Sequence, residues 1–396
     1  MLIGIDGNEA NQKNRVGIGQ FAYNVLKSIS EVNKNDSFLI YLKESPLPDL
    51  PKESDRWHYR IFGPKKLWTQ LALPLQLFTQ KEKLAVFYSP SHYAPRFCPF
   101  PTVISIMDLW HHRHPEQFTS KDLYQLINWE NYSVRRAKRI ITISEFSKSE
   151  IVKYYHYPEE KIKIAYPGFE NYQLSIINYK SRINSQILNV KNKYCIEGDY
   201  LLYLGTLQPK KNLVRLVEAF ALVVSDRLSV VSDQGLGAKD HQSPITNHQS
   251  LITLVIAGKK GWLYEEIFNK VKELNLEKSV IFTGFIDEAE KPYLIAGASA
   301  FVFPSLYEGF GIPVLEAMSL GVPVISSNEG SLPEAGGKAA FYCNPYEVSD
   351  ISRAILEVLS LNKEKRNEII RVGLSQVEGF SWEKCALSVL ETVKNV

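Results

Sequence analysis

The sequence predicts an α/β protein built from two doubly wound, Rossmann-like domains that face a central cleft. Apolar segments of strand length alternate with helical patterns along almost the whole chain, and runs apolar throughout are typical of parallel strands buried on both faces. The length of 396 residues fits two domains that each bury a core. Ligands of open α/β sheets bind beyond the carboxyl ends of the strands, so the site is expected in the cleft.

The first domain is predicted to cover residues 1–170. The strands expected there are Leu2–Ile5, Phe38–Leu42, Ala85–Tyr88, Thr102–Ile106 and Arg139–Ile143. The helices expected between them include Ile18–Glu31 and Leu123–Ala137. This series ends near Tyr166-Pro167-Gly168-Phe169, where turn-forming residues precede a polar segment, and we place the boundary there.

The second domain is predicted to cover residues 171–379. Its expected strands are Tyr200–Leu204, Ile252–Ala257, Val280–Thr283, Ala300–Phe303 and Val322–Ser326, with helices at Leu213–Val224 and Pro313–Leu320. The segment 227–250 is rich in Ser, Asp, Gln, Gly and His and repeats His-Gln-Ser. Connections in such folds are normally a few residues long, so we interpret it as a disordered surface insertion rather than a lid.

Charge and cysteine content exclude several classes of protein. Lys and Arg number 46 and Asp and Glu 43, a formal charge of +3, which does not favour a nucleic-acid partner. The four cysteines form no CxxC pair, and this predicts neither a zinc site nor a disulfide framework. We expect a cytoplasmic location. The basic, then apolar, stretch from Lys65 to Phe78 leaves peripheral contact with the inner face of a membrane as an alternative to an amphipathic core helix.

The segment Phe301–Met318 is the most informative stretch. A strand leads into a loop with Gly309 and Gly311, and a helix opens around Pro313. Free amides at such a loop and helix start favour an anion. Glu308 and Glu316 are expected to face neutral ligand groups such as sugar hydroxyls, because a carboxylate repels phosphate. Two exposed acids on an ordinary turn remain the alternative.

A second loop follows the first strand of this domain. It reads Gly205-Thr-Leu-Gln-Pro-Lys-Lys-Asn212, and its glycine, hydroxyl and two lysines suit a diphosphate. Neither the Walker A spacing nor GxGxxG is present. Lysines at a helix start oppose the helix dipole, which favours a functional explanation over a solvated helix end.

These loops resemble those of the retaining glycosyltransferases of family 4, which have the GT-B fold. Glu308–Met318 matches the family's Glu-x7-Glu element, and Gly205–Asn212 resembles a variant found in bacterial mannosyltransferases of surface polysaccharide synthesis. Asn14–Phe21 and Arg136–Ser147 resemble two further family segments. Phe380-Ser-Trp382 matches a tail helix, about 380–396, that packs back on the first domain.

The resemblance implies a role for each matching residue. Lys211, with Lys210, would bind the donor diphosphate, Glu308 would contact the transferred sugar, and Glu316 would hold the ribose. Backbone around Phe285 and Ile286 would meet the base, and Gly17 and Gly19 would bring the first domain close to the reaction centre. The implied donor site comprises Gly17, Gly205, Thr206, Lys210, Lys211, Phe285, Ile286, Glu308, Gly309, Phe310, Gly311, Ile312 and Glu316, and the implied catalytic residues are Glu308, Lys211 and Asp108.

Asp108 lies where many relatives have His-Asp, but Met107 replaces that histidine. An acceptor-side or donor-sugar contact is therefore missing or supplied by another group. His111, His112 and His114 follow, with a spacing that does not suit one metal ion. We interpret these histidines as structural, with an acceptor-side role as the alternative.

The function implied is transfer of a hexose from a nucleotide sugar to a glycan or lipid-linked acceptor in surface polysaccharide synthesis. The favoured donor is GDP-mannose, and the alternatives are a UDP-sugar-dependent transferase or a nucleotide-sugar 2-epimerase of the same fold. Transfer would retain configuration. No D-x-D occurs, so we expect no metal and no cofactor, the nucleotide sugar being a substrate. The sequence leaves the acceptor, the linkage and the oligomeric state open.

Overall fold

The computed structural model describes residues 1–172, 180–234 and 252–396, with backbone alone for 180–183 and 227–234. The chain divides into two compact units. Unit 1 comprises Met1–Gly168 and Phe380–Val396, and unit 2 comprises Phe169–Gly379. The division lies two residues from the boundary predicted at 170 and 171, and the tail segment belongs to unit 1.

Unit 1 contains a parallel sheet with the strand order β3-β2-β1-β4-β5-β6-β7. Its strands are β1 (Leu2–Asp6), β2 (Ser37–Leu42), β3 (Trp57–Ile61), β4 (Val86–Ser89), β5 (Thr102–Ser105), β6 (Arg139–Thr142) and β7 (Ile162–Ile164). Its helical elements are α1 (Ile18–Val32), η1 (Trp68–Ala72), α2 (Leu73–Thr79), α3 (Trp110–Arg113), η2 (Pro115–Gln117), α4 (Ser120–Arg136), α5 (Glu145–Tyr155), η3 (Glu159–Lys161) and α15 (Trp382–Lys394).

Alternation along β2 shows how both faces of this sheet are covered. Phe38, Ile40 and Leu42 join a core that also contains side chains of α1 and α15. Leu39 and Tyr41 face the other way and pack with η1 and α2. Successive side chains of a strand point to opposite faces, so helices cover both faces of this central strand, as the continuous apolar runs predict.

Unit 2 contains a second parallel sheet with the strand order β10-β9-β8-β11-β12-β13. Its strands are β8 (Tyr200–Leu204), β9 (Thr253–Ala257), β10 (Val280–Gly284), β11 (Ala300–Phe303), β12 (Val324–Ser327) and β13 (Ala340–Cys343). Its helical elements are α7 (Lys180–Lys193), η5 (Pro209–Lys211), α8 (Leu213–Gln234), α9 (Glu265–Glu273), α10 (Lys291–Ala296), α11 (Ile312–Ser319), α12 (Leu332–Gly336), α13 (Val348–Leu359) and α14 (Lys363–Val377).

Both strand orders reverse direction in the same way. The first three strands of each unit run outward to one edge, and the fourth returns to the other side of the first. This is the order of a Rossmann fold, and its ligand crevice lies at the carboxyl ends of the two strands that flank the reversal. In unit 2 these two strands are β8 and β11, which precede the two predicted donor loops.

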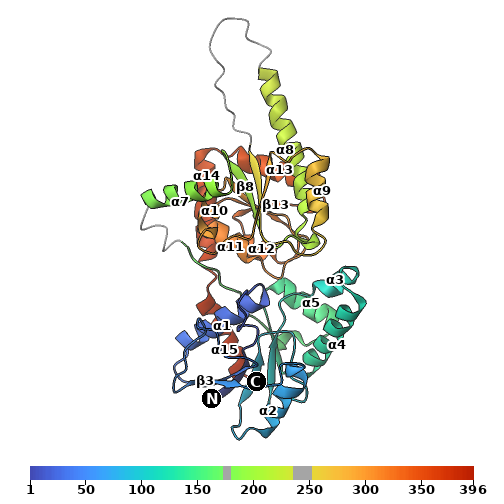
Figure 1. Ribbon diagram of the computed structural model, residues 1–396, viewed down its shortest axis with the longest axis vertical. Coiled ribbons are helices and arrows are strands. Elements are labelled where there is room, and N and C mark those ends of the chain that lie inside the picture. Colours follow the sequence, from blue (N-terminus) through green and yellow to red (C-terminus); the bar gives the residue numbers. More distant parts are fainter. Residues whose placement is uncertain (173–179, 235–251) are drawn as a thin grey trace, which may run out of the picture. The chain divides into compact units, whose positions relative to one another are not determined.

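The insertion predicted at 227–250 begins within helix α8. Helix α8 continues to Gln234 and extends beyond the sheet in Figure 1. Residues 225–234 contain no glycine or proline, and the first helix breaker is Gly235, so nothing local stops the helix earlier. The remainder of the predicted insertion, 235–250, lies outside the described residues.

We expect deletion of residues 235–250, with a short Gly/Ser link in their place, to leave thermal unfolding and donor binding unchanged. The chain entropy of a connection depends only logarithmically on its length, at about 0.6 kcal/mol per doubling. Calorimetric melting and titration with nucleoside diphosphate measure both quantities. A folded deletion variant that has lost activity would show that the segment contributes to the reaction.

Candidate functional site

The two predicted donor loops of unit 2 lie side by side at the ends of β8 and β11. The amide of Leu306 donates to the carbonyl of Lys210 at 2.8 Å, which joins the loop after β11 to the loop after β8. Farther along, the hydroxyl of Ser331 donates to the carbonyl of Glu308 at 2.8 Å. A backbone hydrogen bond therefore joins the two loops, and the side chain of Ser331 holds the loop that carries Glu308.

A third loop, which follows β9, is joined by backbone hydrogen bonds to the loop that follows β8. Gly205 and Leu207 donate amide hydrogen bonds to Ala257 and Lys259, both at 2.9 Å. A Cβ atom on Gly258, whose φ is 141°, would lie 1.9 Å from the carbonyl oxygen of Gly205. Only glycine fits there, because the two backbones almost touch and the conformation is left-handed.

Asn212 fixes the end of the lysine loop. It has a left-handed conformation with φ 61°, which asparagine tolerates better than most residues. Its buried side-chain amide donates to the carbonyls of Pro304 at 3.1 Å and Pro345 at 2.6 Å. One side chain thus ties together the loops that follow β8, β11 and β13, and it holds the preceding lysine in place. The loop pattern alone assigns no role to Asn212.

Lys211 and Glu308 form an ion pair where the strand order of the sheet reverses, between the loops that follow β8 and β11. Both side chains are almost buried, at 12% and 11% exposed, and the ammonium also lies 5.2 Å from the centre of the Phe303 ring. Burial and the negative charge of Glu308 together raise the pKa of nearby Tyr203 well above its ordinary value. The residues predicted to bind the diphosphate and the sugar are therefore partners of each other without ligand.

Glu316 is the second predicted carboxylate, and it also has a lysine partner. It lies in α11, is 4% exposed, and accepts a hydrogen bond from Lys291 Nζ of α10 at 2.6 Å. Burial raises the pKa of Glu316, and Lys291 offsets part of that rise. Burial lowers the pKa of Lys291, but attraction to Glu316, with smaller contributions from Tyr172 and Glu288, raises it overall. Lys291 was not identified from the sequence.

The remaining predicted donor residues follow the same strand ends. Gly311 has φ 116° and precedes α11 as its N-terminal cap, so Ile312 begins the helix and its amide is one of the free donors expected there. Phe285, directly after β10, is 68% exposed, whereas Ile286 is buried. Gly309 and Phe310 lie between the pair-forming Glu308 and the helix start. The hydroxyl of Ser305 is buried and has no hydrogen-bond partner among the described residues.

Unit 1 carries the other predicted residues. Gly17 has φ 51° and caps α1, and an added Cβ on Gly19 would lie 3.1 Å from the carbonyl oxygen of Glu9. Asp108 follows β5 and accepts from the amide of Trp110 at 3.3 Å. Asp108 is half-buried. The structure describes each unit by itself, so the joining of these residues with those of unit 2 stays a prediction.

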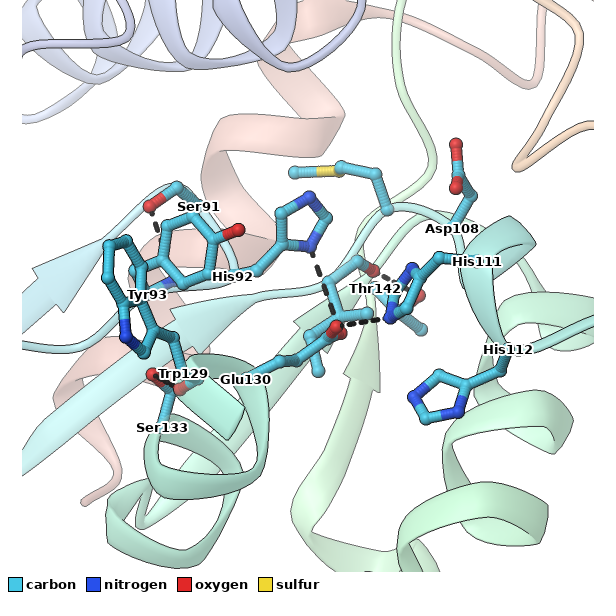
Figure 2. A network of polar contacts seen from close by, with 12 residues as sticks. Ser91, His92, Tyr93, Asp108, His111, His112, Trp129, Glu130, Ser133 and Thr142 are labelled. Carbon is cyan, nitrogen blue, oxygen red and sulfur yellow. Dashed lines mark hydrogen bonds and ion pairs between the residues drawn. The ribbon is translucent and has the colours of Figure 1, made fainter. Parts of the chain in front are cut away.

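A buried polar network lies beside Asp108 (Figure 2). Glu130 of α4 is 1% exposed, and its carboxylate lies 2.9 Å from His111 Nε2 and 4.0 Å from His92 Nδ1. His112 Nε2 lies 2.7 Å from the hydroxyl of Tyr155, and burial, with a smaller effect of His111, lowers the pKa of His112. His114 instead pairs with Glu116 at the surface.

The ligand atoms of His111, His112 and Glu130 lie within 4.8 Å of one another, a separation compatible with one metal ion. Glu130 comes from a different helix, α4, so the sequence spacing of the histidines does not reveal it. However, His112 is engaged by Tyr155, and a metal would have to displace that contact. His111 and Glu130 lie 2.9 Å apart, but His111 Nε2 and Glu130 Oε1 are buried and make no hydrogen bond within the described residues.

Asp6, at the carboxyl end of β1, is a further polar group that the sequence analysis missed. It is 8% exposed and accepts from the amide and the side chain of Asn8 at 3.0 and 2.7 Å. Burial raises the pKa of Asp6 to about 6, and the two hydrogen bonds offset part of the rise.

We expect Asp6→Asn to stabilise unit 1 above pH 6 and to have little effect near pH 4. The pKa of Asp6 is higher in the folded than in the unfolded protein, so the folded protein binds the proton more strongly. The free energy of unfolding therefore falls as the pH rises from about 4 to about 6. Two pKa units correspond to about 3 kcal/mol of unfolding free energy. Thermal unfolding of both proteins across this pH range measures the difference, and a difference independent of pH would contradict the assignment.

Comparison with known proteins matches the two halves of the chain to two related glycosyltransferase families. The family "Glycosyltransferase Family 4" matches residues 36–171, and "Glycosyl transferases group 1" matches residues 191–375. The chain belongs to the family 4 glycosyltransferases. Within the described residues, the two Rossmann-like units of this glycosyltransferase are those of the GT-B fold, so the predicted fold class is confirmed.

Relatives of this glycosyltransferase include bacterial mannosyltransferases. It is 29% identical to the O-antigen chain mannosyltransferase B of Escherichia coli, over 93% of this chain and 85% of that protein. It is 28% identical to the serotype-specific mannosyltransferase WbdA of Escherichia coli over 68% of this chain, but spans only 32% of that protein.

Solved structures share the fold of this glycosyltransferase at low sequence identity. Anabaena HepE in complex with UDP and glucose is 18% identical, with a TM-score of 0.69 over 100% of this chain and 99% of that chain. WaaG, a glycosyltransferase involved in lipopolysaccharide biosynthesis, is 13% identical, with a TM-score of 0.68 and complete coverage of both chains.

Proposed function

We propose that this glycosyltransferase transfers mannose from GDP-mannose, with retention of configuration, to a glycan or lipid-linked acceptor in surface polysaccharide synthesis. The observation that carries the proposal is the buried pair of Lys211 and Glu308 at the reversal point of the unit 2 sheet. A cation and a carboxylate side by side at this point would match the diphosphate and the adjacent sugar ring of a nucleotide sugar. Mannose is supported by the O-antigen mannosyltransferase that covers most of the chain.

When the donor binds, Lys211 and Glu308 would separate, and each would contact a different part of the donor. The diphosphate would draw Lys211 away from Glu308, because a phosphate carries more charge than a carboxylate and forms strong charge-assisted hydrogen bonds. Glu308 would then be free to accept hydrogen bonds from sugar hydroxyls. The amides of Gly311 and Ile312 would add donors at the start of α11.

Glu316 would accept from the ribose with the carboxylate oxygen that Lys291 does not hold. Lys291 contacts Oε1, so Oε2 is the oxygen we assign to the ribose hydroxyls. The lysine would act as a positioning residue, since it keeps the carboxylate ionised and oriented in a buried setting. Phe285 and Ile286, after β10, would lie against the base.

The reaction would proceed by stabilisation of the leaving group. Negative charge develops on the nucleoside diphosphate as its bond to the sugar breaks, and preorganised donors stabilise such charge in a dry site. Lys210, Lys211 and the loop amides would supply these donors. The acceptor hydroxyl would attack the face that the diphosphate leaves, which retains configuration, and Asp108 would lie on the acceptor side.

We expect sugar transfer to continue in excess chelator. If lysines and amides supply the positive charge, no divalent cation is needed opposite the diphosphate. Initial rates of transfer with and without EDTA, after passage of the protein over a chelating resin, test this expectation. Activity that disappears with EDTA and returns with Mg²⁺ or Mn²⁺ would contradict it.

The donor can be identified by a panel of GDP-, UDP- and ADP-sugars in thermal unfolding, followed by transfer assays. A ligand that binds only the folded protein raises its melting temperature, and we expect GDP-mannose to give the largest rise. A larger rise with a UDP-sugar would replace the donor assignment. Release of an epimerised sugar without acceptor would replace the reaction assignment with a 2-epimerase.

A further inference from the structure

The helical segment Leu67–Thr79 of unit 1 buries one face and exposes the other. Trp68, Ala72, Leu73 and Leu77 belong to a core cluster on the sheet. In contrast, Leu71, Leu75 and Phe78 are 61%, 66% and 59% exposed, and Leu67 is 49% exposed. Leu71, Leu75 and Phe78 recur at spacings of four and three residues, which places them on one side of the helix. The amphipathic core helix expected from the sequence therefore also carries an outward apolar face.

Lysines flank this outward face at both ends. Lys65 and Lys66 precede it, and Lys81 and Lys83 follow it, all exposed. The two nearby acids are neutralised, because Glu44 lies 2.7 Å from Lys65 and Glu82 lies 2.8 Å from Arg60. Among the described residues, no ion pair involves Lys66, Lys81 or Lys83. The surface around the apolar face is therefore basic.

We propose that this face, Leu67, Leu71, Leu75 and Phe78 with the four flanking lysines, docks unit 1 onto an anionic lipid bilayer. Large apolar side chains on one side of a helix bury themselves at the level of the acyl chains, while lysines at the rim reach anionic headgroups. Such a face can bind a bilayer without crossing it, and within residues 1–172, 180–234 and 252–396 no helix combines the length and apolarity needed to cross a membrane. The proposal concerns binding alone and holds whichever sugar is transferred.

Sedimentation of the full chain with sucrose-loaded vesicles tests the proposal. Vesicles of phosphatidylcholine with phosphatidylglycerol are expected to bind the chain at least tenfold more strongly than vesicles of phosphatidylcholine alone. The double variant Leu71→Ser/Leu75→Ser should lose at least tenfold of that binding, because both side chains leave the bilayer. Lys66→Gln, Lys81→Gln and Lys83→Gln should each weaken it about fivefold at low salt.

Leu188→Ser is the matched control, because Leu188 is 56% exposed on α7 of unit 2 and has no part in the proposed surface. Melting temperatures should agree among all variants, since the altered side chains are exposed. Equal sedimentation with neutral and anionic vesicles, or no loss in the double leucine variant, would overturn the proposal. So would a dimer, detected by light scattering, that only the double variant dissociates, because the face would then bind a second copy. The sedimentation assay contains neither donor nor acceptor, so its result does not depend on the proposed function.

Discussion

Replacement of Lys211 by alanine is expected to lower kcat/KM for the donor at least tenfold. The lost contact is a charge-assisted hydrogen bond of about 1.5–3 kcal/mol, and each 1.4 kcal/mol corresponds to about one factor of ten. Steady-state rates at varied donor concentration, with calorimetric titration of the nucleoside diphosphate, measure the loss. Lys278→Ala, a change at an exposed lysine of unit 2, is the control.

The ion pair with Glu308 adds a second expected effect. Without Lys211, a nearly buried carboxylate loses its cation, and breaking a buried pair typically costs about 3–5 kcal/mol of stability. The double variant Lys211→Ala/Glu308→Gln should therefore melt at a higher temperature than Lys211→Ala but bind the nucleoside diphosphate no better. Unchanged donor affinity and turnover in folded Lys211→Ala would refute the diphosphate assignment.

The two glutamates are expected to respond differently to conversion to glutamine. Glu316→Gln should weaken binding of the sugar-free nucleoside diphosphate about tenfold, because a carboxylate accepts from ribose hydroxyls more strongly than an amide. Glu308→Gln should leave that binding nearly unchanged and lower the rate of transfer, since a carboxylate beside an oxocarbenium-like sugar contributes most in the transition state.

Calorimetry with the nucleoside diphosphate alone decides between these roles. Glu277→Gln, at an exposed position after α9, controls for the loss of one negative charge from unit 2. If Glu308→Gln weakens the binding as much as Glu316→Gln does, the division of roles is wrong, although the family is unaffected.

The central strands could be predicted from the sequence because they are buried on both faces. The strands predicted in unit 2 agree with β8, β9, β10, β11 and β12 within two residues at each end. The strands that escaped prediction, β3, β7 and β13, all lie at sheet edges. In β3, for example, Trp57 is buried whereas Ile61 is 49% exposed, so its residues lack a continuous apolar run.

The loops of the candidate site could be predicted, but their contacts could not. The glycines after β8 and β11, and the lysines after β8, are local patterns of the sequence that identify these loops. The contact of Glu316 with Lys291, and of Asn212 with two distant prolines, joins segments separated by 25 to 133 residues. Only the strand order brings such residues together. Likewise, Glu130 lies on a helix that the local spacing of histidines does not include.

The tail segment has a consequence for how the protein is made. Helix α15 contributes Cys385, Ala386 and Val389 to the core of unit 1, and Lys394 pairs with Asp36 at 2.5 Å. Unit 1 therefore begins the chain but needs residues 380–396 to close its core. On the ribosome, unit 2 can fold as soon as Gly379 has emerged, whereas unit 1 must wait with an open apolar face. A stop codon before residue 380 would spare every residue of the proposed nucleotide pocket in unit 2 and still leave the apolar core of unit 1 open.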